Sequence, residues 1–339
     1  TKGTSMQSVL DEIRRNHLLW LLIFVPILFA AEQVLHNQPT ALFLLSVLAI
    51  VPLAALLSRA TESVAAQTGD AIGGLLNATL GNLTELVIAV TALSAGEYTL
   101  VKASIAGAIV TNALFMLGGS FLLGGLKYHQ QQFNHAGTRL QSMLLFLAVI
   151  ALMVPSAVGT VDGNAAFTQT LSLALSGLLI LSYGLGMVFS LGTHKKVFAS
   201  VEHADSAQSE PEEHWPMTTS LVTLAVVTVC VALVSEVFVG SVQDAAVALG
   251  MTQAFVGFIV VSLVGAAAEM TSAFSAARKD RLDLSVGIAL GSAAQIALFV
   301  APVLVILSYF VGPTPMSLQF WPGAIVMMLF ATLTATMLT

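Results

Sequence analysis

Apolar runs of about twenty residues recur along most of the chain, and this pattern limits the fold more than any other feature. Each run has the length that an α-helix needs to cross the hydrocarbon core of a bilayer. Backbone polar groups in lipid must be hydrogen-bonded internally, so the runs predict spanning helices, and the alternating segments of a β-barrel are absent. A hydrophobic fraction of 57%, 9% charged residues and a mean hydropathy of +0.91 exclude a soluble domain. We expect an all-α polytopic membrane protein whose partner is the lipid bilayer, with no nucleic-acid partner.

The apolar runs and the basic residues together predict a topology. Ten spanning helices are predicted, at about 18–36, 40–57, 72–95, 103–125, 139–158, 166–192, 217–240, 254–278, 284–308 and 316–338. With the N-terminus in the cytoplasm, eleven of the 12 Lys and Arg residues fall on the cytoplasmic side, and only Lys102 falls on the other. The compact loops favour a prokaryotic inner membrane.

The apolar runs form two halves that match each other. A shift of 184 residues pairs Gly73 with Gly257, Gly81 with Gly265, Glu85 with Glu269 and Gly107 with Gly291. The two acid-bearing helices are the third and the eighth, an odd number of crossings apart, so they run in opposite directions through the membrane. Antiparallel repeats with polar breaks at mid-depth are typical of secondary transporters, which place the site at the repeat interface.

The repeat divides the chain into four segments. They are an extra N-terminal helix (1–39), the first repeat (40–192), a polar acidic linker on the cytoplasmic side (193–216) and the second repeat (217–339). The acids and histidines of the linker lack regular ligand spacing, which favours a solvated linker over a cation sensor. Two repeats of five helices plus the extra helix require eleven spans, so the chain is expected to lack one C-terminal helix.

Glu85 and Glu269 each lie in the middle of an apolar helix. A charge at that depth costs roughly 2.5–3.5 kcal/mol on insertion scales and is by default a sign of function. A protonated acid that only packs two helices together is the alternative for one glutamate, but two glutamates in matching contexts argue against it.

Neutral polar residues surround the two acids in the sequence. The candidate ligands of a cation are the carboxylates of Glu85 and Glu269 and the oxygens of Asn82, Thr111, Asn112, Ser292 and Gln295. Two carboxylates with several neutral oxygens suit a hard cation such as calcium. For Thr111 and Ser292 taken singly, packing between helices is an equally good explanation. A single cysteine, Cys230, leaves no thiol metal site or disulfide, and no cofactor is predicted.

Three segments carry a resemblance to a known family. They are GNLTEL at Gly81–Leu86, GAAAE at Gly265–Glu269 and GSAAQIALFVAPVLV at Gly291–Val305. They resemble the signature segments of the cation/proton exchanger family, a branch of the calcium/cation antiporter superfamily. The resemblance implies that Glu85 and Glu269 bind calcium or protons, and that Thr111, Asn112, Ser292 and Gln295 are supporting polar positions. This chain departs from the family pattern at Ala266 and Met270, where Asn and His are usual, and at Ala108, where Ser is usual.

The acid pair and the resemblance predict a secondary active antiporter that exchanges calcium, or a similar divalent cation, for protons by alternating access. A sodium-driven calcium exchanger is the alternative. The sodium/calcium exchanger branch of the superfamily tends to carry a further acid in the helix after each acid-bearing one, and neither 103–125 nor 284–308 has an acid away from its ends, which favours protons. A passive channel is a third reading. The sequence carries no HExxH or GxSxG motif, so no enzyme is predicted. A homo-oligomer is left open.

Overall fold

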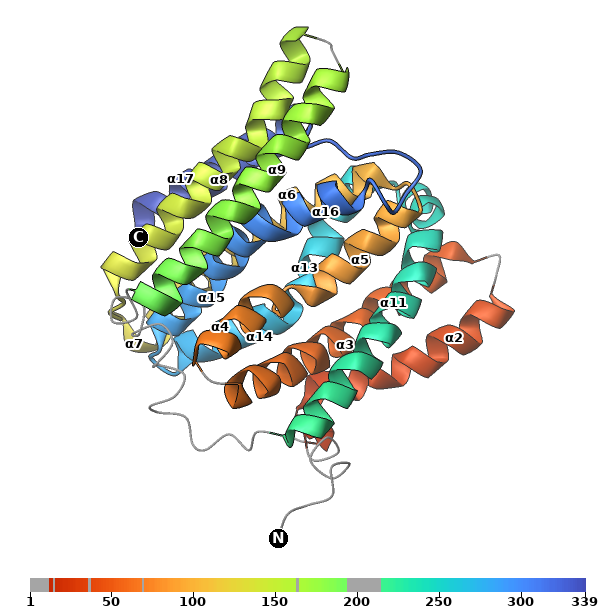
Figure 1. Ribbon diagram of the computed structural model, residues 1–339. Helices are drawn as coiled ribbons and strands as arrows, with labels where there is room; N and C mark the ends of the chain where they lie inside the picture. The colour runs from red at the N-terminus through yellow and green to blue at the C-terminus, as the bar shows by residue number, and fades with distance from the viewer. Residues whose placement is uncertain (1–11, 15, 36–37, 69, 163–164, 194–214) are drawn as a thin grey trace.

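The computed structural model describes residues 12–14, 16–35, 38–68, 70–162, 165–193 and 215–339. Within these ranges the chain forms helices and no strand (Figure 1). The acidic linker predicted at 193–216 falls almost wholly outside them. The helices before the linker are η1 (His17–Ile23), α2 (Phe24–Val34), α3 (Pro39–Gln67), α4 (Asp70–Leu80), α5 (Leu83–Ser94), α6 (Tyr98–Val110), η2 (Thr111–Met116), α7 (Leu117–Tyr128), α8 (His135–Asp162), α9 (Ala165–Met187) and η3 (Val188–Thr193).

The second half repeats this pattern of long and broken helices. It comprises α11 (Met217–Ala248), α12 (Gln253–Phe255), η4 (Val256–Val261), α13 (Ser262–Gly265), α14 (Ala267–Arg278), α15 (Leu282–Gln295), η5 (Ile296–Val300), α16 (Ala301–Leu307) and α17 (Pro322–Leu338). In the described part of the chain, seven helices are long and apolar enough to span a membrane, and a pair bent by 57° makes an eighth. Two shorter apolar helices, α5 and α17, accompany them. The all-α polytopic fold is confirmed, while the count of ten spans stays a prediction.

Equivalent helices of the two halves deviate from α-helical geometry at equivalent places. The third predicted span breaks at Gly81 and Asn82, and the eighth breaks at Ala266. The following span of each half contains a π-helical turn, η2 over Thr111–Met116 and η5 over Ile296–Val300. A shift of 184 residues brings each pair of irregularities into register, so the repeat found in the sequence has a structural counterpart.

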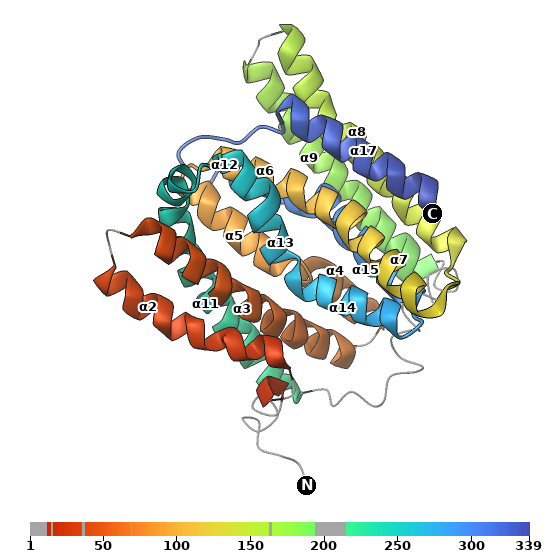
Figure 2. The ribbon, with the colours of Figure 1, turned by 180° about the vertical axis from the view of Figure 1, so that it is seen from behind.

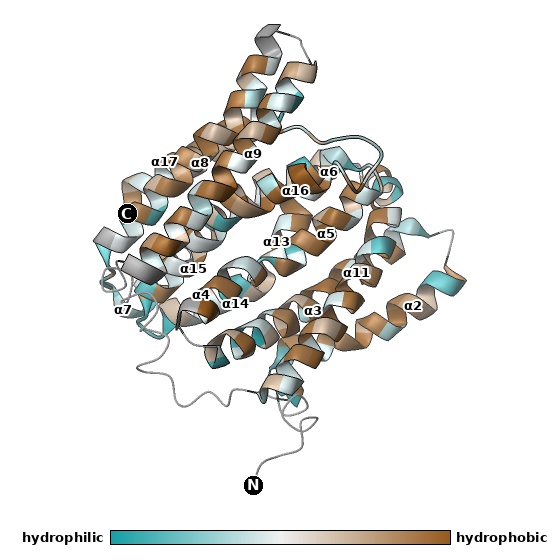
Figure 3. Cartoon of the chain, viewed as in Figure 1, coloured by the Kyte–Doolittle hydropathy of each residue, from teal (hydrophilic) through white to brown (hydrophobic). Residues whose placement is uncertain are grey.

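The broken helices lie between two groups of long helices. Figures 1 and 2 show α4, α5, α13 and α14 between a group formed by α2, α3 and α11 and a larger group that includes α6, α8, α9, α15 and α17. In the first group α3 packs along α11, and the rings of Phe43 and Phe238 stack with centroids 5.4 Å apart. Figure 3 shows apolar residues along the outer helices and hydrophilic residues gathered near helix ends and loops, as expected of helices in lipid.

Small residues let α6 approach η4 closely. A Cβ added to Gly257 would lie 2.6 Å from the Cβ of Ala103 and 2.8 Å from the carbonyl oxygen of Leu100. A Cβ added to Gly107 would collide with the carbonyl of Phe258. Glycine is common at such contacts in membranes because van der Waals packing, and not the hydrophobic effect, holds the helices together. This crossing fixes the span that follows the acid-bearing one in the first repeat against the acid-bearing span of the second repeat.

Two helices are longer than the hydropathy predicts. The apolar run predicted an end near 57 for α3, but the helix continues to Gln67 and carries Arg59 and Glu62 in its last turns. Helix α11 continues to Ala248 instead of ending near 240. Hydropathy marks the part of a helix that lies in lipid, whereas the backbone hydrogen bonds continue beyond it. The polar end of α3 is the part of the fold that matters most below.

Candidate functional site

Each helix break places one glutamate at the start of a half-helix. Glu85 lies in the first turn of α5, which begins after Asn82, and Glu269 lies in the first turn of α14, which begins after Ala266. The free N–H groups and the dipole of a helix N-terminus favour negative charge. The side chain of Asn82 does not cap its own helix. It reaches across to the other repeat.

The carboxyl group of Glu85 lies against the helix break of the second repeat. A Cβ added to Gly265 would lie 2.8 Å from Cγ of Glu85 and 3.0 Å from its Oε1. Gly265 stands one turn before Glu269, and the two carboxyl groups lie near enough to act on each other electrostatically. The structure therefore brings together the two acids that the shifted sequence pairs.

Four neutral residues near the acids form one chain of hydrogen bonds. The amide nitrogen of Asn82 donates to Oε1 of Gln295 over 2.6 Å, and the hydroxyl of Ser292 donates to Oδ1 of Asn82 over 3.0 Å. The amide nitrogen of Asn112 donates to the hydroxyl of Ser292 over 2.8 Å. Ser292 also lies near the Glu269 carboxylate. Residues from both repeats thus form a single polar cluster.

Three oxygens of this cluster are buried and accept no hydrogen bond from the described residues. They are Oε1 of Glu85, Oε2 of Glu269 and Oδ1 of Asn112. An unsatisfied buried acceptor costs about 1–3 kcal/mol, and more when the group is charged. Two carboxylate oxygens and a carbonyl oxygen without donors are the kind of ligands that a hard cation takes. The cluster suits a cation that is carried as a substrate.

Thr111 lies outside this chain of hydrogen bonds. Its hydroxyl pairs with the hydroxyl of Ser262 over 3.1 Å, and both side chains are buried. Ser262 was not among the residues expected from the sequence. It stands one helical turn before the break at Ala266, and this spacing was the only signal that pointed to it. The other expected residues, Asn82, Asn112, Ser292 and Gln295, come together as described.

The two repeats contribute unequal ligands. The partner of Asn82 under the 184-residue shift is Ala266, which is fully buried and has no polar side-chain atom. The partner of Ser292 is Ala108, also buried. Glu269 consequently lies beside a hydroxyl, whereas Glu85 lies against the bare backbone of Gly265. The pair of acids is symmetric, but its surroundings are not.

Two polar pockets lie beside the acid-bearing helices, one against α14 and one against the far end of α5. The Arg59 pocket, about 200 Å³, lies between the polar end of α3 and helix α14, and Ala268, next to Glu269, forms part of its lining. The Glu97 pocket, about 380 Å³, lies between α5 and α11, and Thr91, which follows Glu85 on α5, forms part of its lining. The cluster therefore has a pocket toward each face of the molecule.

A helical bundle with two broken, acid-bearing helices meeting at its centre defines a class, the secondary transporters with inverted repeats. The profile of the sodium/calcium exchanger protein family matches residues 38–192 and 219–339. A protein of Aphanothece halophytica named Ca(2+)/H(+) antiporter is 42% identical over 90% of this chain and 85% of its own length. The Ca(2+)/H(+) antiporter ChaA of Bacillus subtilis is 38% identical over 94% of this chain and 90% of its own.

A solved structure, that of native YfkE, has the same fold. It superimposes with a TM-score of 0.80 at 36% identity, over 95% of this chain and 91% of the solved one. The chain belongs to the sodium/calcium exchanger protein family, in its cation/proton exchanger branch. Members of this family are integral membrane transporters, and the resemblance drawn from the three sequence segments is confirmed.

Proposed function

We propose that this protein exchanges calcium for protons across a membrane, and that Glu85 and Glu269 bind either ion. The observation that carries the proposal is the pair of carboxylates with buried oxygens that accept no hydrogen bond in the described residues. Two ionised carboxylates give the empty cluster a charge of −2, and one calcium ion or two protons each cancel it. The printed names of the two relatives, Ca(2+)/H(+) antiporter in both cases, support the same pair of ions.

Neutralisation couples the two fluxes. Moving a net charge into a low-dielectric interior costs several kcal/mol per ion, so the empty, doubly charged cluster rarely changes the side to which it opens. The calcium-bound and the doubly protonated forms carry no net charge and do change sides. Because only loaded forms return, calcium moves one way only as protons move the other. The protein therefore works by alternating access, and exchange is obligatory because the empty, charged cluster rarely changes sides.

Asn82, Asn112, Ser292 and Gln295 supply the neutral part of the proposed site. Asn112 has an unpaired carbonyl oxygen for the ion, and Ser292 hydrogen-bonds the amide of Asn82 and reaches Glu269. Thr111 stands behind this group and acts through its contact with Ser262.

The basic residues set the orientation that we propose. Arg59, Lys127, Arg139 and Arg278 belong to helix ends on one side, and this basic side faces the cytoplasm of a prokaryotic cell, together with the N-terminus. The Arg59 pocket then opens to the cytoplasm and the Glu97 pocket to the outside. Calcium is exported in this orientation when protons flow in.

The test is calcium uptake into everted membrane vesicles whose interior is made acidic, with sodium absent. We expect rapid uptake by the wild-type protein and none by Glu85→Gln or Glu269→Gln, because a neutral amide leaves the cluster with one charge only. Glu32→Gln, a matched change in α2 outside both repeats, is expected to keep uptake. Uptake that requires a sodium gradient instead of protons supports the sodium-driven alternative. Normal uptake by both variants at the acid pair refutes the proposal.

A further inference from the structure

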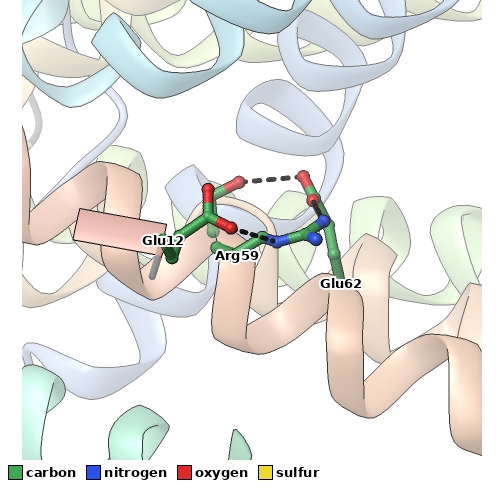
Figure 4. A network of polar contacts seen from close by, with 4 residues as sticks. Glu12, Arg59 and Glu62 are labelled. Carbon is green, nitrogen blue, oxygen red and sulfur yellow. Dashed lines mark hydrogen bonds and ion pairs between the residues drawn. The ribbon is translucent and has the colours of Figure 1, made fainter. Parts of the chain in front are cut away.

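A largely enclosed arginine lines a pocket beside the acid-bearing helix of the second repeat. Arg59 projects from the polar end of α3, and its side chain is 13% exposed. Its Nε lies 3.7 Å from Oε2 of Glu12, and its Nη1 lies 3.8 Å from Oε2 of Glu62. Figure 4 shows the guanidinium between the two carboxylates. Ser58 also donates to Glu62 over 3.2 Å. These residues line the same pocket as Ala268, the chain neighbour of Glu269, and Glu62 lies near enough to Glu269 to act on it electrostatically, so the positive charge stands close to the acid pair.

The arginine is held from outside the repeats. Glu12 belongs to the N-terminal segment before η1, whereas Glu62 belongs to α3 itself. The exposed fraction of Glu12 is 13%, and that of Glu62 is 46%. Glu12 is therefore the more enclosed of the two partners, and its ion pair is the less screened by water. The N-terminal segment therefore helps to hold a positive charge in the pocket beside α14.

The opposite pocket lacks this arginine. Gln243 occupies the position that a shift of 184 residues relates to Arg59, and it lines the Glu97 pocket. Three acids line that pocket, Glu97, Glu236 and Asp244, and its lining includes no lysine or arginine. The Arg59 pocket has two acids and one base. The symmetric plan of the fold does not require a cation here, so the charge of Arg59 is a feature of one side only.

We propose that Arg59 opposes the approach of divalent cations to the acid pair and thereby sets the calcium concentration at which exchange from this side is half-maximal. This inference rests on the proposed exchange function. Arg59 touches neither glutamate of the cluster in the described contacts, so it acts on the ion through the charge of the pocket. Glu12 holds the guanidinium back and offsets part of its charge. The N-terminal segment then tunes affinity without contributing a ligand.

The direction of each substitution follows from charge. Arg59→Gln makes the pocket more negative, so the KM for calcium falls, by about three- to tenfold for a unit charge that acts on a divalent cation over about 6–12 Å of water. Glu12→Gln removes the more enclosed of the two carboxylates that offset the arginine charge, so the pocket becomes more positive and the KM rises by a similar factor. Arg59→Lys keeps the charge and is expected to stay near the wild-type KM. The maximal rate should change little in all three, because saturating calcium overcomes an electrostatic barrier to access.

The experiment measures uptake into everted vesicles against calcium concentration, at a fixed proton gradient, with protein amounts compared by blotting. Arg278→Gln is the matched control, since it removes an arginine from the exposed end of α14 outside the pocket lining. It is expected to leave the KM unchanged. A structural role of Arg59 would reduce the rate in both Arg59→Gln and Glu12→Gln, whereas the charge mechanism moves their KM values in opposite directions.

The other pocket offers the reciprocal test. Gln243→Arg introduces the missing charge at the equivalent position, and the KM for calcium supplied from the outer side should rise in right-side-out vesicles. An unchanged KM in Arg59→Gln, or a shift in the same direction in Arg59→Gln and Glu12→Gln, overturns the proposal. If Arg59→Gln fails to reach the membrane, Glu12→Gln and Gln243→Arg decide the matter alone. The wild-type protein is assayed in the same experiment. If it still exchanges calcium for protons while the KM values fail to shift as expected, the role of Arg59 is refuted and the exchange function is not.

Discussion

Gly265 is the position where the smallest possible change tests the geometry of the acid pair. A methyl group there would lie 2.8 Å from Cγ of Glu85, whereas carbon atoms in contact pack at about 3.5–4.0 Å. The Glu85 side chain must therefore retreat by about 1 Å, which its rotatable bonds allow at little cost to the fold. We expect Gly265→Ala to reach the membrane with a melting temperature close to that of the wild type.

The same displacement should be severe for exchange. In enzymes, a misplacement of about 1 Å at a reacting group lowers the reaction rate on the order of a hundredfold. A calcium ion that bridges two carboxylates requires comparable precision. We expect calcium uptake per unit protein to fall at least about tenfold in Gly265→Ala, in everted vesicles at a fixed proton gradient. Gly291→Ala is the matched control, because its added Cβ would meet nothing within 4 Å. It should transport normally.

A second substitution separates displacement from a general loss of structure. Glu85→Asp shortens the side chain by one methylene, so it gives back the space that the methyl group of Gly265→Ala takes. We expect the double variant, Gly265→Ala with Glu85→Asp, to lose less uptake than the two single variants together predict. In a double-mutant cycle this result is a favourable coupling between the two positions. Wild-type uptake by Gly265→Ala would show that Glu85 does not work against this backbone, and the arrangement of the site would be wrong.

Two further predictions test the surroundings of the acids. Ser292→Ala removes the hydroxyl that donates to Asn82 and accepts from Asn112, which leaves buried amide atoms unpaired. Unpaired buried groups cost about 1–3 kcal/mol, so the KM for calcium in the same uptake assay should rise by a factor of about ten. Gly107→Ala drives a methyl group into the carbonyl of Phe258, so the melting temperature in detergent should fall by several degrees for an overpacking cost of about 1–3 kcal/mol. Wild-type values in either variant would contradict the corresponding contact.

The pairing of Glu85 with Glu269 could be predicted because it depends only on spacing. A glycine and an acid at the same separation in two antiparallel segments place the acids at one depth, and the fold then has little freedom in where they meet. The polar partners could be listed for the same reason. The contacts among these partners could not be predicted, because Asn82 turns away from its own helix end and Thr111 turns toward Ser262. Those choices depend on side-chain rotation in a packed interior.

The Arg59 pocket could not be predicted from hydropathy. Arg59 and Glu62 stand beyond the apolar run, where composition indicates a loop, and only the continuation of α3 to Gln67 places them on an ordered helix. Their partner Glu12 comes from a segment with no counterpart in the repeat. An ion pair between residues so far apart in the chain leaves no periodic signal, so pattern analysis passes over it.

Both repeats carry a glycine four residues before the acid, Gly81 and Gly265, but only the first carries the asparagine, Asn82. One physical explanation covers both facts. Two acids on oppositely directed helices can touch only if one carboxylate finds room beside the backbone of the other helix, and Gly265 provides that room for Glu85. At Gly81 an added Cβ would stand 3.7 Å from Oε1 of Gln295, an ordinary contact, but 2.6 Å from the carbonyl oxygen of Asn77 in the preceding turn. One glycine therefore accommodates a ligand and the other accommodates the helix break. Steric requirements hold both positions, whereas in the proposed exchange a single cation between the repeats would need a neutral ligand such as Asn82 from one of them only.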